Sequence, residues 1–211
     1  MTTLSKWRIN YPDGELTMEN ITHCPFELFE EWLQKAFNDD VIEPNAMTLS
    51  TVDNNQPDSR MVLLKDFNKN GFVFYTNYQS QKGQQIAANN HAALCFWWPN
   101  CHRQVRVKGT IEKLDAQKSN NYFASRDRDT QIGAWASKQS QIIGNYQQLL
   151  NEVEHKKQQF SNKTVLRPQH WGGYILRPNC FEFWQGRHSR LHDRILFNKN
   201  GDIWSTSRLS P

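Results

Sequence analysis

Apolar residues recur at spacings of three and four near the start of the chain. Phe26, Phe29 and Leu33 follow this spacing directly after Pro25, and proline is tolerated in the first turn of a helix. The pattern predicts an amphipathic helix over residues 25–38.

From residue 46 onwards the hydrophobic pattern changes to that of β-strands. Runs rich in β-branched and aromatic residues cover 46–53, 59–67 and 71–77, and turn-forming residues lie between them at 53–57 and 68–71. We expect these three runs to form an antiparallel meander.

The rest of the chain continues with short strands and a helical interruption. The pattern predicts a short polar helix at 79–90, strands at 91–98 and 103–115, helical structure from 115 to 160 with a break at 126–130, and strands at 171–177, 180–186, 191–197 and 202–208. Eight or nine short strands with few long crossovers favour an antiparallel β-barrel with helical insertions over a parallel α/β sheet. The predicted class is therefore mainly β with helical insertions (α+β).

Composition supports one folded domain. The 211 residues suit a single domain over 1–211, in which we expect residues 1–20 to be a flexible N-terminal segment. Apolar residues make up only 37% of the chain, and the mean hydropathy is -0.79, yet there are 8 Trp, 12 Phe and 6 Tyr. A disordered chain would be poor in such aromatics. Because the apolar share is small, we expect a partner subunit to complete some of the burial.

Charge and motifs exclude several classes of protein. The net charge is +4, and acidic and basic residues are largely interspersed, which does not favour general nucleic-acid binding. The four cysteines form no metal-ligand spacing, and no apolar run reaches the roughly 18 residues of a membrane helix. We expect a cytoplasmic protein with reduced thiols and no metal. Nucleotide-binding glycine motifs and the common hydrolase motifs are also absent.

Cations placed within or beside the β-runs are the unusual feature. Arg60 and Lys65 bracket an apolar run, Lys82 opens the short helix, and further cations follow in 103–108. Charged side chains within strands need partners of opposite charge. The phosphate of a ligand is one counter-ion that would explain several cations in these positions. An ordinary solvated face or internal ion pairs would also explain each residue taken singly.

Two later segments combine basic and aromatic residues. One is 122–130, and the other is 184–194, in which Arg190, His192 and Arg194 share one face if the run is extended. Such a row suits a concave anionic site, although a solvent-exposed strand remains an alternative.

Five motifs in register resemble one known family. They are RMVLLK at 60–65, FYTN at 74–77, RQVRVKG at 103–109, QIGAWASKQS at 131–140, and FWQG followed by RLHDR within 183–194. With these motifs the chain resembles the pyridoxine (pyridoxamine) 5′-phosphate oxidases from about Trp7 to its last residues. The resemblance implies an FMN-dependent homodimer with a split-barrel fold and FMN sites at the interface. It also implies oxidation of pyridoxine or pyridoxamine 5′-phosphate to pyridoxal 5′-phosphate by dioxygen, with release of hydrogen peroxide.

The resemblance also implies roles for individual residues. The implied FMN ligands are Arg60, Met61, Val62, Leu63, Leu64, Lys65, Tyr75, Thr76, Lys82, Gln104, Gln139, Ser140, Trp184 and Arg194. The implied substrate ligands are Lys65, Tyr122, Arg126, Thr130, Arg190, Leu191 and His192, with Arg8 and Tyr11 in a segment that can close over the substrate. Arg190 and His192 are the candidate catalytic residues. Positioning of the substrate is favoured for both over proton transfer, which needs a geometry that sequence does not provide.

Three positions depart from the family pattern. Gln81 stands where an arginine is common, which removes one cation from the FMN phosphate site, Thr130 replaces a serine, and Asp127 replaces a proline. Two other functions stay open. One is another split-barrel flavoprotein, such as a flavin reductase or a haem-handling relative, and the other is a non-enzymatic module that binds RNA or carries pyridoxal phosphate. The substrate set around Arg126 and Arg190 argues for the oxidase, because an FMN site alone would not need it.

Overall fold

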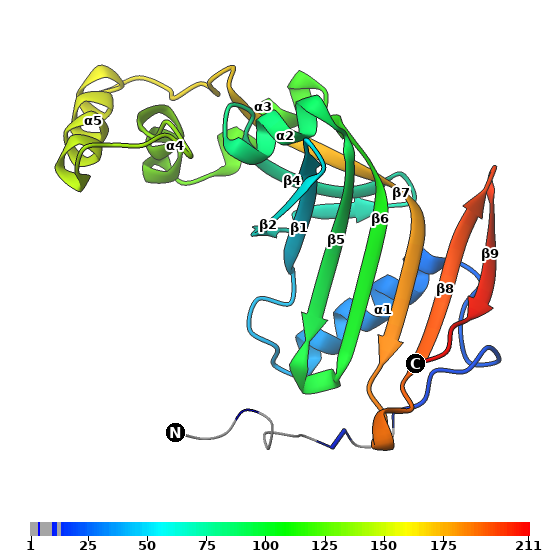
Figure 1. Ribbon diagram of the computed structural model, residues 1–211. Helices are drawn as coiled ribbons and strands as arrows, with labels where there is room; N and C mark the ends of the chain where they lie inside the picture. Colours follow the sequence, from blue (N-terminus) through cyan, green and yellow to red (C-terminus); the bar gives the residue numbers. More distant parts are fainter. Residues whose placement is uncertain (1–3, 5–9, 12–13) are drawn as a thin grey trace.

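The computed structural model describes residues 4, 10–11 and 14–211, and most of the described chain forms one large sheet with helices around it (Figure 1). The helices are α1 (Pro25–Asn38), α2 (Gln81–Ala88), α3 (Ala116–Ser125), α4 (Arg128–Ala136) and α5 (Tyr146–Gln159). The strands are β1 (Ala46–Asp53), β2 (Gln56–Leu63), β3 (Asp66–Asn68), β4 (Gly71–Asn77), β5 (His91–Trp98), β6 (Arg103–Lys113), β7 (Trp171–Gln185), β8 (Asp193–Asn200) and β9 (Ile203–Arg208). The predicted class, mainly β with helical insertions, is confirmed, and so is the first predicted helix. The predicted flexible segment 1–20 lies partly outside the described residues.

Every pair of neighbouring strands in the sheet is antiparallel. The strand order is β2-β1-β5-β6-β7-β4-β3, with β8 paired to β7 and β9 paired to β8. β7 has three neighbours, because its first half pairs with β4, its second half pairs with β8, and nearly all of it pairs with β6. The sheet therefore branches at β7, with β4 beside its first half and β8 beside its second half.

The chain crosses between the two outer strands of this order at Leu64 and Lys65. The Leu64 N–H donates to the Asn45 oxygen beside β1, and the Lys65 N–H donates to the Val73 oxygen in β4, both at 2.9 Å. The predicted meander is wrong at this point, because the run 59–67 changes hydrogen-bonding partner and divides between β2 and β3. The outer strands β2 and β3 are therefore consecutive in the chain, and the link between them closes the sheet into a barrel.

The long strand β7 replaces two shorter strands that were predicted at 171–177 and 180–186. Its pairing with β6 shifts register at Gly109, opposite Pro178. Proline has no N–H to donate, and a β-bulge accommodates the gap in the ladder. A Cβ at Gly109 would lie 2.0 Å from the Arg177 oxygen, so only glycine fits there. The prediction of two strands is wrong because the bulge carries the ladder past the proline.

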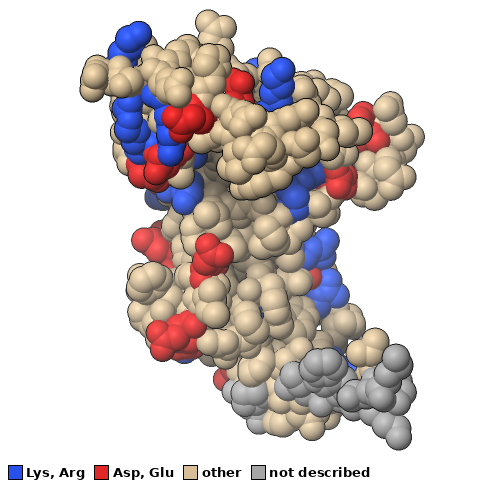
Figure 2. Space-filling view, turned by 90° about the vertical axis from the view of Figure 1, so that its left-hand side faces the viewer, with Lys and Arg blue, Asp and Glu red and all other residues tan. Residues whose placement is uncertain are grey.

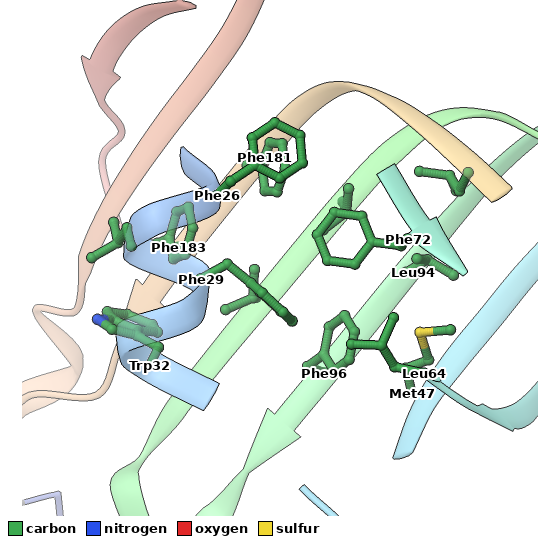
Figure 3. Packing of buried hydrophobic residues seen from close by; sticks show 14 of the residues in the cluster. Phe26, Phe29, Trp32, Met47, Leu64, Phe72, Leu94, Phe96, Phe181 and Phe183 are labelled. Atoms are coloured by element: carbon green, nitrogen blue, oxygen red, sulfur yellow. The ribbon is translucent and has the colours of Figure 1, made fainter. Parts of the chain in front are cut away.

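The core is built from large rings that α1 presses against the sheet (Figure 3). Phe29 is fully buried, and its ring centroid lies 4.9 Å from those of Phe72 and Phe96 in edge-on geometry. Trp32, one turn later, meets Phe183 of β7 at 5.2 Å. Edge-on aromatic pairs stabilise a core beyond the area that they bury. A few large side chains thus fill the core of a chain with a small apolar share.

Helices α3, α4 and α5 project from one end of the sheet, away from α1 (Figure 1). They enclose a second, smaller apolar cluster made of Phe123, Ile132, Val165 and Trp171. The prediction of one break at 126–130 is partly wrong, because the structure has a shorter break there and a second one at 137–145. Each new helix begins at a side-chain cap: Asp127 accepts the Thr130 N–H at 2.9 Å, and Asn145 caps α5 in the same way.

The packing of α1 predicts a large difference in stability between two substitutions on the same helix. Phe29→Ala should lower the free energy of unfolding by about 3–5 kcal/mol, because it leaves a cavity between α1 and the sheet. Phe37→Ala is the matched control, since this ring is 67% exposed, and it should change stability by less than about 0.5 kcal/mol. Urea unfolding of both variants measures the difference. Equal losses would contradict the packing described here.

Candidate functional site

A cavity of about 1100 Å³ lies between the end of β2, β4 and the helices α3 and α4. It is lined by eleven of the predicted site residues: Met61, Val62, Leu63, Lys65, Tyr75, Thr76, Lys82, Tyr122, Arg126, Thr130 and Gln139. A second cavity, of about 760 Å³, lies on the sheet between β1, β5, β6 and β8 and contains none of them. We call the first one the helical-end cavity.

Lys82 brings together three of the predicted FMN ligands at one end of this cavity. Its Nζ donates to the Gln139 side chain at 3.2 Å and to the hydroxyls of Thr76 and Ser80 at 3.3 Å. All three acceptors are neutral. Burial, and then the nearby charge of Arg60, lowers the pKa of Lys82. An anion at this point would favour the charged form of Lys82 and so oppose the lowering of its pKa, because it supplies the missing opposite charge.

Arg126 presents a second cation, which forms no ion pair within the described part of the chain although the charge of Asp127 is near. Its Nη1 is buried and has no hydrogen-bond partner among the described residues, and the guanidinium lies 4.7 Å from the ring centroid of Trp171. Burial lowers its pKa. A buried donor without a partner costs free energy, so the cavity favours an anionic ligand at Arg126. The neighbouring Thr130 hydroxyl donates to the oxygens of Asp127, which caps α4.

Three parallel rings form the cavity wall beside Arg126. Tyr75 and Tyr122 stack at 3.8 Å, and Trp171 lies parallel to both at 5.6 and 6.2 Å. Sequence reasoning missed Trp171, although its setting carried a signal. Two glycines follow it in a strand, and glycine inside a strand often marks a close approach of other groups.

A second group of predicted residues lies at the other end of β7. Gln104, Trp184 and Arg194 stand directly opposite one another on β6, β7 and β8. The His192 ring lies 4.5 Å from that of Trp184, and Tyr11 lies 5.9 Å from each of them. This set, with Arg190 and Leu191, is called the β7–β8 group. Arg8, predicted to act with Tyr11, lies outside the described residues.

Arg190 does not continue the strand that was predicted to carry it. A 3₁₀ turn spans His188–Arg190, with positive φ at Ser189 and Arg190, and β8 begins only at Asp193. The expected common face of Arg190, His192 and Arg194 is therefore wrong, because the turn interrupts the extended backbone. Arg190 is instead exposed at the tip of the β7–β8 connection.

The tautomer of His192 follows from one hydrogen bond. The backbone N–H of Arg187 donates to Nδ1 of His192 at 3.0 Å, so this nitrogen is an acceptor and a neutral ring carries its proton on Nε2. Burial, and then the charge of Arg190, lowers the pKa of His192. The ring is therefore neutral near pH 7, and its free nitrogen offers a donor.

Arg194 is held by an acidic residue that sequence reasoning also missed. Glu182 accepts hydrogen bonds from Arg194 Nε at 3.0 Å and from Arg106 Nη1 at 2.9 Å, and it is 9% exposed. An acid between Phe181 and Phe183, both buried in the core, was its signal in the sequence. Glu182 thus bridges the two arginines, and its contact holds Arg194 beside Trp184.

Three other predicted FMN residues take different positions. Arg60 is outside the cavity lining and is bound to Asp58, Leu64 is buried in the main core, and Ser140 follows Gln139 with a positive φ of 71°. Their predicted roles remain predictions.

The helical-end cavity and the β7–β8 group lie far apart in one chain. Trp171 lines the cavity, Trp184 belongs to the β7–β8 group, and both are on β7. A strand rises about 3.3 Å per residue, which separates them by roughly 40 Å along the strand. Figure 1 shows the helices α3 to α5 at one end of the sheet and the β7–β8 connection at the other. One chain alone therefore does not bring the predicted residues together.

Charged side chains are intermingled on the surface beside the helical end. Figure 2 shows Lys and Arg next to Asp and Glu there, and Lys157 pairs with Asp129 at 3.5 Å. The pattern differs from the continuous basic stripe typical of nucleic-acid binding. No helix in the described part of the chain is both long and apolar enough to cross a membrane.

Comparison with known proteins finds two family models that together match most of the chain. The model described as pyridoxamine 5′-phosphate oxidase matches residues 33–160, and the pyridoxine 5′-phosphate oxidase C-terminal dimerisation region matches residues 171–211. The pyridoxine/pyridoxamine 5′-phosphate oxidase of Synechocystis sp. is 49% identical over 99% of this chain and 98% of its own. The protein of the same name from Burkholderia lata is 47% identical over 100% of both chains.

Solved structures share the fold. PhzG from Burkholderia lata, in complex with tetrahydrophenazine-1-carboxylic acid, superposes with a TM-score of 0.88 at 24% identity over 95% of this chain and 99% of its own. An FMN-binding protein related to pyridoxamine 5′-phosphate oxidase from Nostoc punctiforme has a TM-score of 0.69 at 16% identity over 90% and 100%. These similarities confirm the predicted split-barrel fold.

The hydrogen bond to His192 predicts a specific tautomer and titration. The ring should carry its proton on Nε2 and should titrate below the ordinary value of 6.5, because protonation of Nδ1 would break the bond from Arg187. Two-bond ¹H–¹⁵N spectra recorded from pH 5 to pH 8 measure both properties, and the His192→Gln spectrum assigns the signal. A proton on Nδ1, or a midpoint above the ordinary value, would contradict this geometry.

Proposed function

Because this chain belongs to the pyridoxamine 5′-phosphate oxidase family, we propose that it oxidises pyridoxine or pyridoxamine 5′-phosphate to pyridoxal 5′-phosphate. Dioxygen is the acceptor and hydrogen peroxide is released, together with ammonia from the amine. In enzyme terms the chain is a pyridoxal 5′-phosphate synthase. The observation that carries this proposal is the buried Nη1 of Arg126, which has no hydrogen-bond partner among the described residues and belongs to a side chain that lines the same cavity as Lys65 and Lys82.

FMN is the cofactor, and the residues at Lys82 fit its phosphate. The Lys82 ammonium donates to the neutral acceptors Thr76, Ser80 and Gln139. A phosphate would add acceptor oxygens and the negative charge that these residues lack. A cavity of about 1100 Å³ has room for a flavin and a small substrate. When bound, FMN supplies the electron acceptor for the hydride that leaves the substrate.

The substrate phosphate is assigned to the opposite part of the cavity. Arg126 has a buried donor there that no described residue satisfies, Tyr122 forms part of the wall, and Lys65 is exposed nearby. Trp171 holds the guanidinium of Arg126 by a cation–π contact at 4.7 Å. These residues bind and orient the phosphate, and their position fixes where the reacting carbon lies.

His192 and Arg190 are assigned to the polar groups of the substrate ring. The Nε2–H of His192 can donate a hydrogen bond but cannot accept a proton while Nδ1 is bonded to the Arg187 N–H. His192 therefore orients the substrate and does not act as the base. Arg190 is exposed at its turn, where a planar guanidinium can cover a flat ring.

We further propose a homodimer in which each site combines the helical-end cavity of one chain with the β7–β8 group of the other. The separation of roughly 40 Å along β7 and the match of residues 171–211 to a dimerisation region support this arrangement. Met61 beside the cavity and Trp97 beside Trp184 are 62% and 46% exposed in the single chain. A partner subunit would bury both. The four unpaired thiols also support the proposed location in the reducing cytoplasm.

The oxidase activity is tested by the visible spectrum of the FMN-loaded protein. Anaerobic addition of pyridoxine 5′-phosphate should bleach the flavin band, and air should restore it with formation of peroxide. Arg126→Ala should need about 10- to 100-fold more substrate, because a hydrogen bond to a charged group is lost. Arg128→Ala is the matched control, since this arginine binds the oxygens of Phe160 and Lys163 instead.

Two results would overturn the proposed activity. One is a colourless protein that forms no peroxide even after FMN is added. The other is rapid oxidation of a reduced nicotinamide cofactor without any reaction of the vitamin phosphates, which would indicate another split-barrel flavoprotein.

The shared site is tested by mixing two variants that are each nearly inactive when the substrate concentration is far below the wild-type KM. Arg126→Ala damages the cavity, and Arg190→Ala damages the β7–β8 group. A mixed dimer would contain one intact site, so random mixing should restore about a quarter of the wild-type activity per subunit. Activity is measured after co-refolding, with each variant refolded alone as the control. No recovery in verified mixed dimers would contradict a site shared between two chains.

A further inference from the structure

The guanidinium of Arg60, predicted to neutralise the FMN phosphate, already has an anionic partner. Its Nη2 lies 2.6 Å from Oδ2 of Asp58 and 2.8 Å from Oε1 of Gln85, and its Nη1 donates to Thr51 Oγ1 at 2.7 Å. The Arg60 side chain is 18% exposed, against 34% for Asp58. Arg60 thus already forms a short ion pair and two further hydrogen bonds with Thr51 and Gln85.

The partners of Arg60 are bonded to one another as well. Nε2 of Gln85 donates to Oδ2 of Asp58 at 3.0 Å, and the Thr51 hydroxyl donates to Oε1 of Gln85 at 2.6 Å. Gln85 is 6% exposed, and Thr51 is fully buried. Thr51 and Gln85 would keep Arg60 in place even without the charge of Asp58. The carboxylate is therefore not needed to fix the position of the arginine.

This network lies beside the position assigned to the FMN phosphate. Lys82 and Gln85 are three residues apart on α2 and share one face of the helix, and the charge of Arg60 is close enough to lower the pKa of Lys82. Gln81 adds no charge. The cations Arg60 and Lys82, less Asp58, leave one net positive charge, whereas a phosphate monoester carries about -1.5 to -2 at pH 7.

We propose that Asp58 competes with the FMN phosphate for Arg60 and weakens the binding of FMN by this chain. The inference rests on the proposed function, because it takes Lys82 and Arg60 as the phosphate site. FMN binding brings a second anion to an arginine that already has one, and like charges repel. Asp58 acts as a negative determinant of cofactor affinity, which adds to the effect of the missing cation at Gln81.

The substitution Asp58→Asn tests this competition. Asparagine keeps the shape and one acceptor oxygen for Arg60, and it removes the charge together with the second acceptor oxygen, Oδ1, to which the Ser59 N–H donates at 2.8 Å. We expect the dissociation constant of FMN to fall about three- to ten-fold, as the repulsion of one charge a few ångströms away in a partly hydrated site implies. Quenching of flavin fluorescence during titration of the apoprotein measures it. Glu112→Gln is the matched control, because it removes one negative charge from a strand ion pair with Arg177.

Riboflavin separates the charge effect from a change in structure. It lacks the phosphate, so Asp58→Asn should leave its affinity unchanged, whereas a general change at the cavity would alter both ligands alike. In an Arg60→Gln background, Asp58→Asn should tighten FMN binding by less than in the wild type. Thermal unfolding of each variant checks that it is folded.

The outcomes distinguish this inference from the proposed function. If the wild type binds FMN and Asp58→Asn leaves its affinity unchanged or weakens it, the proposed competition is overturned. The proposed oxidase activity is unaffected by that result. An equal gain with Glu112→Gln, or with riboflavin, would also overturn it. Failure of every variant to bind FMN would overturn both.

Discussion

The hydrogen-bonded ladder along β7 is the constraint on which the placement of both functional groups depends. β7 pairs with β6, with β4 through its first half and with β8 through its second half. A strand bonded on both edges cannot slip by one residue without exchanging the faces of its side chains. Trp171 is thereby fixed in the cavity wall, and Trp184 is fixed between Gln104 and Arg194. The bulge at Gly109 allows one strand to reach both places.

Local signals in the sequence were sufficient where an element is determined by its own residues. Helix 25–38 was predicted with its observed bounds, because its hydrophobic period and its first-turn proline both lie within it. The errors occurred where distant partners decide the structure. Pro178 looked like a strand end, but β7 itself bulges beside it and continues, and the run 59–67 divides because its two halves bond to different strands.

The candidate site shows the same division between local and distant determinants. Motif resemblance named eleven residues that line one cavity, yet it could not show that Trp184 lies at the other end of the sheet. Trp171, Glu182 and Asp58 were missed because their importance comes from what they contact: an arginine in each case. The sequence shows the order of the residues, but the residue that contacts each arginine depends on how the strands and helices pack.

Three arginines of the proposed site differ in their charge partners, and this difference bears on what each can do. Arg60 is paired with Asp58, and Arg194 shares Glu182 with Arg106, so both arginines already have a carboxylate partner. Arg126 forms no ion pair with the described residues, although the charge of Asp127 is near; it packs on aromatic rings and has a buried nitrogen without a hydrogen-bond partner among those residues. An incoming phosphate gains most at the unpaired arginine, because there it satisfies a donor that nothing else satisfies. At a paired arginine it must share the donors with an existing anion. Affinity for the substrate phosphate should therefore depend chiefly on Arg126, whereas Arg194 and Arg60 contribute position and tune the binding of the cofactor.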